Sequence, residues 1–321
     1  MYMMLHLCHK IAYYLYTTQQ TAYSKGRIKN MIAHTEISII IPCYNESENL
    51  LLFLPILCKS FDKAEIIIVD DCSTDDSNDV AKAFPVNIIR HPRNLGNGAS
   101  IKTGARNATR DYIIFMDSDG QHDPHDIPKL LEKLEKGYDM VVGARSASSQ
   151  ASLVRRAANT FYNKLASMMT GYKIEDLTSG FRAARTSKFR KFLYLLPNGF
   201  SYPTTSTMAF FRSGFPVAYV PIIAASRSGK SKIRHLHDGT RFFIIILKIG
   251  ALFSPMRLFL PISAAFFLTG ILYYVYTYTL TGRFTNMSAL LFIASLMTFL
   301  IGIISEQISS LHYKGVEQDE K

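Results

Sequence analysis

Short β-branched apolar runs alternate with helical hydrophobic periods from Ile37 to about residue 143. The runs are ISIIIP, EIIIVDD, VNIIR, DYIIFMD and DMVVG, at residues 37–42, 65–71, 86–90, 111–117 and 139–143. Alternation of this kind is typical of a largely parallel sheet with helices on both faces. The pattern therefore predicts an α/β, Rossmann-like fold.

Polar side chains follow the ends of the predicted strands. They are Tyr44, Asn45 and Glu46, then Asp70 and Asp71, then His91 and Arg93, and finally Asp117 and Asp119. In open α/β sheets, ligands bind beyond the carboxyl ends of the strands. We therefore expect these side chains to line one crevice.

Two apolar runs follow in the C-terminal part of the chain. The segments from Leu258 to Leu280 and from Met287 to Ser305 reach the roughly 20 residues that cross a bilayer, and the first has no charged residue. Only TGRFTN lies between them. A pair of buried core helices is the alternative, but the pattern favours a two-helix transmembrane hairpin.

Basic residues cluster just before this hairpin, whereas the connection between its helices carries only Arg283. The cluster comprises Arg227, Lys230, Lys232, Arg234, Arg241, Lys248 and Arg257. By the positive-inside rule, this asymmetry predicts that the α/β domain and both chain ends lie in the cytoplasm, at the plasma (inner) membrane if the source is bacterial. The same residues punctuate an apolar stretch, which predicts an amphipathic juxtamembrane helix.

The chain thus divides into five expected segments. They are a leader (1–33), an α/β domain (34–228), an amphipathic juxtamembrane segment (229–256), a transmembrane hairpin (257–310) and a tail (311–321). The leader is apolar but broken by His6, His9 and Lys10, so we expect it to be disordered or a start-site artefact, and dispensable.

The net charge of the chain indicates which kinds of molecule it binds. The formal net charge of +11 calls for an anionic partner, such as nucleic acid, lipid headgroups or a phosphorylated substrate. Nucleic acid is disfavoured, because the basic residues cluster beside the apolar runs without an interleaved aromatic platform. The four cysteines form no C-x-x-C pair, which indicates a reduced compartment without a disulfide framework.

The segment FMDSDGQHDP carries the strongest local signal for chemistry. An apolar strand ends there in Asp117 and Asp119, with the amide of Gln121 two residues further on. Mg²⁺ and Mn²⁺ prefer oxygen ligands and commonly keep few from the protein. A helix cap is the alternative reading, and it explains Asp123 better than Asp117 or Asp119.

A glycine-rich helix start follows the third predicted strand, in RNLGNGASIKTGARNA. It lacks the G-x-G-x-x-G spacing of a dinucleotide fingerprint. With Arg93 and Lys102 beside it, a diphosphate could rest there, although a tight turn explains the glycines equally well.

Six motifs stand in a fixed order between about Ile37 and Lys232, namely IPCYNE, VDDCSTD, D-x-D-x-Q, VVGAR, EDLTSGFR and RSGKSK. In these motifs the chain resembles the family 2 glycosyltransferases of GT-A fold. Within that family it resembles the polyprenyl-phosphate sugar synthases, which include dolichyl-phosphate mannosyltransferases and undecaprenyl-phosphate glucosyltransferases. The resemblance implies a GT-A fold and hexose transfer from a UDP- or GDP-sugar to a polyprenyl phosphate. It departs at Cys72, where glycine is frequent, and at Gly120, where a larger apolar residue is usual.

The resemblance also implies roles for individual residues. The nucleoside pocket would hold Pro42, Tyr44, Glu46 and Asp71, with Asp117 beneath the ribose and diphosphate. Asp119 and Gln121 would bind Mg²⁺ or Mn²⁺. Phosphates would meet Arg145, and Arg155 or Arg156. Asp176 would lie near the acceptor, and Arg227 and Lys232 near the reaction centre.

Inverting transfer needs a polarised leaving group and an aligned nucleophile. A metal and arginines would neutralise the departing diphosphate. A lipid phosphate is largely ionised at neutral pH and needs positioning more than a base, whereas a hydroxyl acceptor would need a carboxylate base, for which Asp176 is the candidate. Two other functions therefore stay open: transfer to a hydroxyl of a membrane-linked glycan, and a non-catalytic scaffold that binds a nucleotide sugar. The sequence also leaves open the donor sugar and base and a homo-oligomer.

Overall fold

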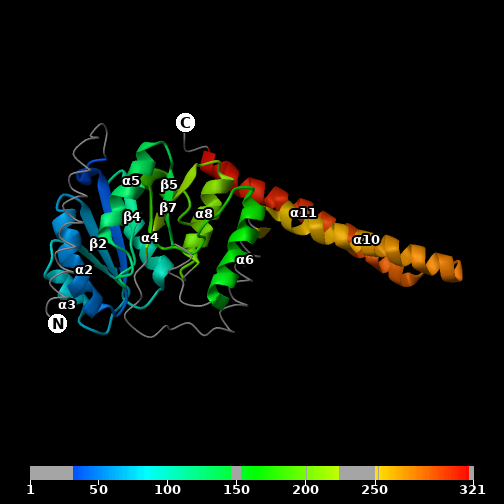
Figure 1. The fold of residues 1–321 in the computed structure, drawn as a ribbon, viewed down its shortest axis with the longest axis horizontal. Coiled ribbons are helices and arrows are strands. Elements are labelled where there is room, and N and C mark those ends of the chain that lie inside the picture. Colours follow the sequence, from blue (N-terminus) through cyan, green and yellow to red (C-terminus); the bar gives the residue numbers. More distant parts are fainter. Residues whose placement is uncertain (1–31, 146–152, 200, 224–249, 252, 318–321) are drawn as a thin grey trace, which may run out of the picture.

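The computed structural model describes residues 32–145, 153–199, 201–223, 250–251 and 253–317. A seven-stranded mixed sheet forms the centre of the larger part (Figure 1), in the order β3-β2-β1-β4-β6-β5-β7. The strands are β1 (Ile37–Cys43), β2 (Glu65–Asp70), β3 (Asn87–Arg90), β4 (Tyr112–Phe115), β5 (Met140–Arg145), β6 (Arg182–Arg185) and β7 (Val217–Ile222).

All strand pairs are parallel except those of β6, which runs antiparallel to both β4 and β5. The five strands expected from the apolar runs are therefore confirmed, as is the mostly parallel sheet. The apolar pattern did not predict β6 and β7. The short β6 has the sequence RAAR, so no apolar run marks it.

Helices cover both faces of this sheet. They are α2 (Ser47–Ser60), α3 (Ser77–Lys82), α4 (Asn97–Asn107), α5 (Ile127–Glu135), α6 (Leu153–Thr170), α7 (Thr186–Arg190) and α8 (Tyr202–Arg212), with short 3-10 turns η1 (His34–Glu36) and η2 (Pro124–Asp126). Every residue of β1 is buried, and successive side chains alternate between two cores. Ile39 and Ile41 pack with α2 and α5, whereas Ile40 packs with α4 and α8.

Helix α4 lies directly on the central strand because Gly104 has no side chain. A Cβ at this position would stand 2.3 Å from Cγ2 of Ile40. This close approach fixes the height of α4 above the sheet, and with it the position of the loop that precedes the helix.

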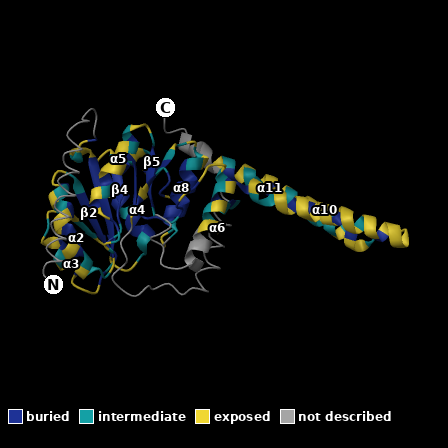
Figure 2. Ribbon diagram, viewed as in Figure 1, coloured by how far each residue is buried: buried dark blue, intermediate teal, exposed yellow. Residues whose placement is uncertain are grey.

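Two long helices leave the α/β domain as one arm, α10 (Pro255–Thr281) and α11 (Asn286–Glu317) (Figure 1). Both are long and apolar enough to cross a membrane. A core helix of a soluble protein can pass the same test, but it would be mostly buried. Here only 11% and 17% of the most apolar windows are buried, and the arm is largely exposed in Figure 2. Such a surface fits a bilayer, as expected from the sequence.

Small and polar side chains hold the two helices together. The hydroxyl of Ser263 donates to the carbonyl of Ser295 at 2.9 Å, and the Ser295 hydroxyl donates back to the carbonyl of Ser263 at 2.9 Å. Gly270 allows close contact, since a Cβ there would lie 3.1 Å from the ring of Phe292. These are the devices that pack helices in lipid, where apolar surface alone gives no driving force.

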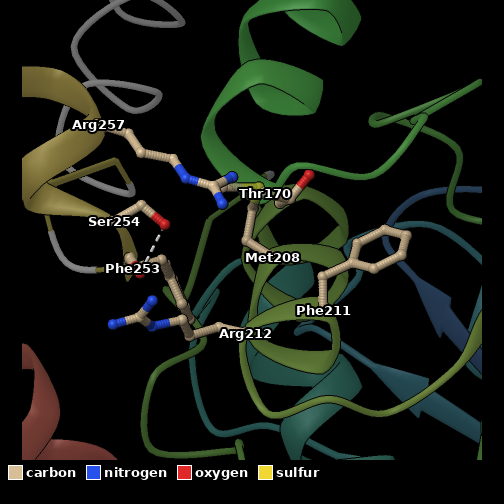
Figure 3. Close-up of a pocket in the computed structure, with 7 residues that line it drawn as sticks. All are labelled: Thr170, Met208, Phe211, Arg212, Phe253, Ser254 and Arg257. Carbon is tan, nitrogen blue, oxygen red and sulfur yellow. Dashed lines mark hydrogen bonds between the residues drawn. The ribbon is translucent and has the colours of Figure 1, made fainter.

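The arm joins the domain through charged contacts. Arg212, at the end of α8, pairs with Glu306 of α11 at 2.6 Å, and Arg257 of α10 donates to the carbonyls of Met168 and Met169 at the end of α6. A pocket of about 90 Å³ lies at this joint (Figure 3). Thr170, Met208, Phe211, Arg212, Phe253, Ser254 and Arg257 line it. None of them lies at the carboxyl end of a strand.

Most of the expected juxtamembrane segment and leader lies outside the described residues, including residues 1–31 and 224–249.

Candidate functional site

The loops after β1 and β2 interlock at the carboxyl edge of the sheet. The backbone N–H of Asn45 donates to the hydroxyl of Ser73 at 3.0 Å, and the Asn45 side chain accepts from the N–H of Thr74 at 2.8 Å. The N–H of Glu46 donates to the hydroxyl of Ser77 at 2.9 Å. Asn45 therefore joins the two loops.

Three of the residues expected in a nucleoside pocket lie on or beside this junction. Pro42 is buried in β1 and aligns with Val69 of β2. Tyr44, the first residue after β1, has 40% of its surface exposed, and Glu46 accepts a hydrogen bond from the side chain of Asn49 at 2.6 Å.

Cys72 adopts a left-handed backbone conformation, with φ of +64°. This conformation costs a side chain with a Cβ about 1–2 kcal/mol, and glycine adopts it freely. The observation explains why glycine is frequent at this position of the motif.

Asp71 is buried and its carboxylate is fully engaged. It accepts from the N–H groups of Leu95 and Gly96, each at 2.8 Å, and lies 2.7 Å from Nδ1 of His91. The other ring nitrogen of His91 lies 2.9 Å from the hydroxyl of Thr103. Asp71 therefore fixes the loop before α4, and the part of His91 in this network was not foreseen. Its expected contact with a nucleoside stays a prediction.

The glycine-rich start of α4 is covered by another loop of the chain. The N–H groups of Gly98 and Ala99 donate to the carbonyls of Gly199 and Asn198, at 3.2 and 3.0 Å. A Cβ on Gly98 would stand 2.1 Å from the carbonyl oxygen of Pro197, so this glycine is needed for close packing. Close packing thus explains Gly98, whereas the φ of +98° at Gly96 fits the tight turn that the sequence allowed.

Lys102 belongs to the same contact. Its ammonium donates to the carbonyl of Leu196 at 3.1 Å and to the side chain of Asn198. Burial, with a smaller effect from the charge of Arg106, lowers the pKa of Lys102. The described contacts hold α4 to the loop at 196–198, and the expected contact with a diphosphate stays a prediction.

The acidic loop after β4 carries the expected metal ligands. Asp117 and Asp119 are partly exposed, and the N–H of Gln121 donates to Asp119 Oδ1 at 3.2 Å. Gly120 has a φ of +70°, which turns the chain sharply between Asp119 and Gln121. Within the described residues, no three His, Cys, Asp or Glu side chains gather as a metal cluster. Two carboxylates and an amide oxygen still suit a divalent cation that takes its other ligands from phosphate and water.

His122 closes this loop against the domain. It is buried, stacks on Phe181 with ring centres 5.1 Å apart, and its Nδ1 has no hydrogen-bond partner in the described structure. Burial, and then the charge of Arg145, lower the pKa of His122 to about 4 against the opposing charge of Asp119. The imidazole is therefore neutral at physiological pH.

Arg145 and Asp176 form a two-pronged ion pair beside the acidic loop. Nε of Arg145 donates to Oδ2 of Asp176 at 2.8 Å, and a terminal nitrogen donates to Oδ1 at 3.0 Å. That carboxylate also accepts from the N–H groups of Thr178 and Ser179. Burial alone would raise the pKa of Asp176, but the hydrogen bonds and charge of Arg145 outweigh it and lower the pKa. The structure brings these two expected residues together.

The segment that follows Asp176 packs against Asp117. A Cβ on Gly180 would stand 2.4 Å from Oδ2 of Asp117, and the carbonyl of Gly180 accepts from the hydroxyl of Tyr202 at 3.1 Å. Arg182 lies behind them with no exposed surface. The sequence placed Gly180 and Arg182 in the motif EDLTSGFR but gave neither a role.

Arg227 and Lys232, the expected basic residues of the reaction centre, lie outside the described residues, as do the side chains of Arg155 and Arg156.

Two family models match the chain. Residues 38–193 match the model described as Glycosyl transferase family 2, and residues 254–311 match the GtrB C-terminal hairpin. The second match coincides with α10 and most of α11.

Curated relatives match either about half of this chain or most of it. The undecaprenyl-phosphate 4-deoxy-4-formamido-L-arabinose transferase of Photorhabdus laumondii is 38% identical over 160 residues, which are 47% of this chain and 49% of that protein. The chain thus spans about half the length of this relative. Glycosyltransferase AglJ of Haloferax volcanii is 24% identical over 306 residues, which are 89% of this chain and 97% of that protein.

A solved structure of glucosyl-3-phosphoglycerate synthase from Mycobacterium tuberculosis, with Mn²⁺ and uridine-diphosphate-glucose, shares the fold. Its TM-score is 0.54 at 20% identity, over 69% of this chain and 83% of that chain. At this identity the likeness speaks for the fold alone, and it confirms the expected GT-A-like architecture. The family matches themselves bear out the resemblance that the motifs indicated: the chain contains a glycosyl transferase family 2 domain, matched over residues 38–193, followed by a GtrB C-terminal hairpin.

Proposed function

We propose that the chain is an inverting glycosyltransferase that moves a hexose from a nucleoside diphosphate sugar to a polyprenyl phosphate, such as undecaprenyl or dolichyl phosphate. The family 2 domain and the GtrB hairpin support sugar transfer at a membrane. The Photorhabdus relative, named as an undecaprenyl-phosphate sugar transferase, supports the class of acceptor. The reaction would take place at the cytoplasmic face, because basic residues precede the hairpin.

The hydrogen bonds of the Asp176 carboxylate are the observation that favours a phosphate acceptor over a hydroxyl acceptor. Both oxygens of its carboxylate accept hydrogen bonds from Arg145, and its pKa is lowered. A general base works best with a pKa near the operating pH and a free lone pair facing the proton. Asp176 is therefore a poor base for a hydroxyl, and we assign it to positioning Arg145. An acceptor that is already ionised needs no such base.

A divalent cation fits this proposal. The mycobacterial synthase was solved with Mn²⁺ and UDP-glucose, and also with Mg²⁺ and UDP. Here Asp119 and Gln121 would hold the cation, which when bound would neutralise charge on the departing diphosphate.

The protein's own residues supply the remaining requirements. Arg145, held rigidly by Asp176, presents a fixed positive charge beside the acidic loop. Pro42, Tyr44 and Glu46 would bound the nucleoside, and Arg227 and Lys232 would position the acceptor phosphate. The hairpin keeps the domain at the surface where a polyprenyl phosphate resides.

Reconstituted full-length protein gives a direct test. It would be incubated with Mn²⁺, each of several radiolabelled UDP- and GDP-sugars, and one of three acceptors: undecaprenyl phosphate, undecaprenol or a lipid-linked glycan. We expect label in an acid-labile lipid with the phosphate only. Label on a glycan hydroxyl would favour the alternative transferase, and nucleotide-sugar binding without transfer to any acceptor would favour the scaffold.

A further inference from the structure

Arg182, the first residue of β6, is a fully buried cation, and none of its hydrogen-bond partners in the described part of the chain is a carboxylate. Its terminal nitrogens donate to the carbonyls of Pro203 and Ser179 and to the hydroxyls of Ser206 and Thr207, and its Nε donates to Ser179 as well. Every one of these acceptors is neutral. The guanidinium thus has satisfied hydrogen bonds but no direct ion-pair partner among the described residues.

A buried, unpaired arginine lowers the stability of the folded protein. Burying an ion costs several kcal/mol unless an opposite charge compensates it, and apolar side chains of similar volume often replace buried ions without loss. A methionine could fill much of the same space. The presence of an arginine here, instead of an apolar side chain, therefore indicates a use for its charge.

The acidic loop after β4, which carries Asp117, is the place where this charge can act. Arg182 holds the carbonyl of Ser179, and Tyr202, over whose ring the guanidinium lies at 5.8 Å, holds the carbonyl of Gly180. Gly180 in turn packs directly on the carboxylate of Asp117. Burial lowers the pKa of Arg182, and Tyr202 and Tyr219, followed by the carboxylates of Asp176 and Asp117, act against that effect, so the buried cation interacts with both carboxylates.

We propose that Arg182 is a positioning residue for sugar transfer. Its guanidinium holds the backbone of Ser179 and Gly180 against Asp117, and its buried positive charge offsets the negative charge that a metal-bound nucleoside diphosphate brings to this wall. Because it is enclosed by protein, the charge acts through a medium of low polarity, where a fixed cation is worth more than in water. This inference rests on the proposed donor, but not on the acceptor.

The test compares Arg182→Met with Arg182→Lys in the full-length protein. Binding of UDP and of GDP with Mn²⁺ is measured by calorimetry, and the nucleotide that binds wild type more tightly is used throughout. We expect Arg182→Met to weaken binding at least 10-fold and Arg182→Lys, which keeps the charge, to weaken it less than about 3-fold. In a kinetic assay of sugar transfer, kcat should fall further in Arg182→Met than in Arg182→Lys.

Arg185→Met is the matched control, because Arg185 lies in the same strand but pairs with Asp139 at 3.2 Å, away from Asp117. Its nucleotide binding should equal that of wild type. Wild-type binding by folded Arg182→Met, or equal weakening in the methionine and lysine variants, would overturn the proposal.

If Arg182→Met does not fold, Tyr202→Phe decides, since it removes only the hydroxyl that holds Gly180. We then expect kcat to fall at least 3-fold with nucleotide binding unchanged, and an unchanged kcat would count against the proposal. Nucleotide binding that depends on Arg182, in a protein that labels no polyprenyl phosphate, would reject the proposed acceptor and keep this inference.

Discussion

The guanidinium of Arg145 meets the carboxylate of Asp176 edge to edge, with two hydrogen bonds at 2.8 and 3.0 Å, and its own backbone N–H reaches the same carboxylate at 3.2 Å. The pair joins β5 to the loop before β6, and thereby orients an arginine beside the acidic loop. A planar guanidinium matches a carboxylate in this way, whereas lysine does not.

Asp176→Asn should lower kcat about 10- to 100-fold, equivalent to roughly 1.4–2.8 kcal/mol of lost transition-state stabilisation. If Asp176 positions Arg145, the pH profile of kcat should keep its shape in the variant, because the carboxylate is ionised throughout the neutral range. Loss of an acidic limb from the profile would instead identify Asp176 as the general base.

The same pair should give a stability signature in acid. The folded pKa of Asp176 lies below its usual 3.8, so its contribution to stability is fully present above that value and is lost as the pH falls through the folded pKa. Thermal unfolding between pH 5 and 2 should therefore show a smaller acid loss of Tm in Asp176→Asn than in wild type. Equal pH dependence in both proteins would contradict this account.

Asp119→Asn should abolish metal-dependent transfer while the protein stays folded, because one carboxylate supplies most of the protein charge toward the cation. The rate with and without EDTA measures the effect. Asp123→Asn serves as control, since Asp123 caps a 3-10 turn by accepting from the N–H of His125 at 2.9 Å. EDTA-sensitive activity retained by the Asp119 variant would refute the assignment.

Gly180→Ala should lower kcat at least 10-fold, or about 1.4 kcal/mol, because its methyl group would displace the carboxylate of Asp117. Gly199→Ala is a suitable control, since no described atom outside its two chain neighbours lies within 4 Å of a Cβ at that position. Kinetics and Tm of both variants separate a local displacement from unfolding. Normal turnover in Gly180→Ala would show that the position of Asp117 is unimportant.

Arg227→Ala and Lys232→Ala should each depress turnover strongly and leave membrane association and nucleotide binding intact, if these residues position the acceptor phosphate. Flotation with liposomes, nucleotide calorimetry and the transfer assay separate the three properties. Normal turnover combined with loss from the membrane would make the segment an anchor.

The strands that the sequence predicts correctly are those with a strong apolar pattern. The buried runs around Ile40, Ile67 and Ile114 marked their strands because each is enclosed on both faces. The antiparallel strand β6 escaped, because Arg182 and Arg185 flank only two alanines.

The sequence predicts those candidate site residues that directly follow an apolar strand. The pairing of Arg145 with Asp176 brings together residues 31 positions apart, and no local pattern encodes that contact. The same holds for Asp71, whose carboxylate holds backbone N–H groups more than 20 residues away. Chain folding decides which polar group is left free for a ligand.

Helix α8 touches both the membrane arm and the wall behind Asp117. Arg212 at its end pairs with Glu306 of α11, while Ser206 and Thr207, nearer its start, hold the guanidinium of Arg182. At a rise of about 1.5 Å per residue, these contacts are only about 8–9 Å apart along one rigid rod. We therefore expect α8 to transmit a tilt of α11 to the residues behind Asp117, so that the thickness of a surrounding bilayer would affect the proposed site of sugar transfer.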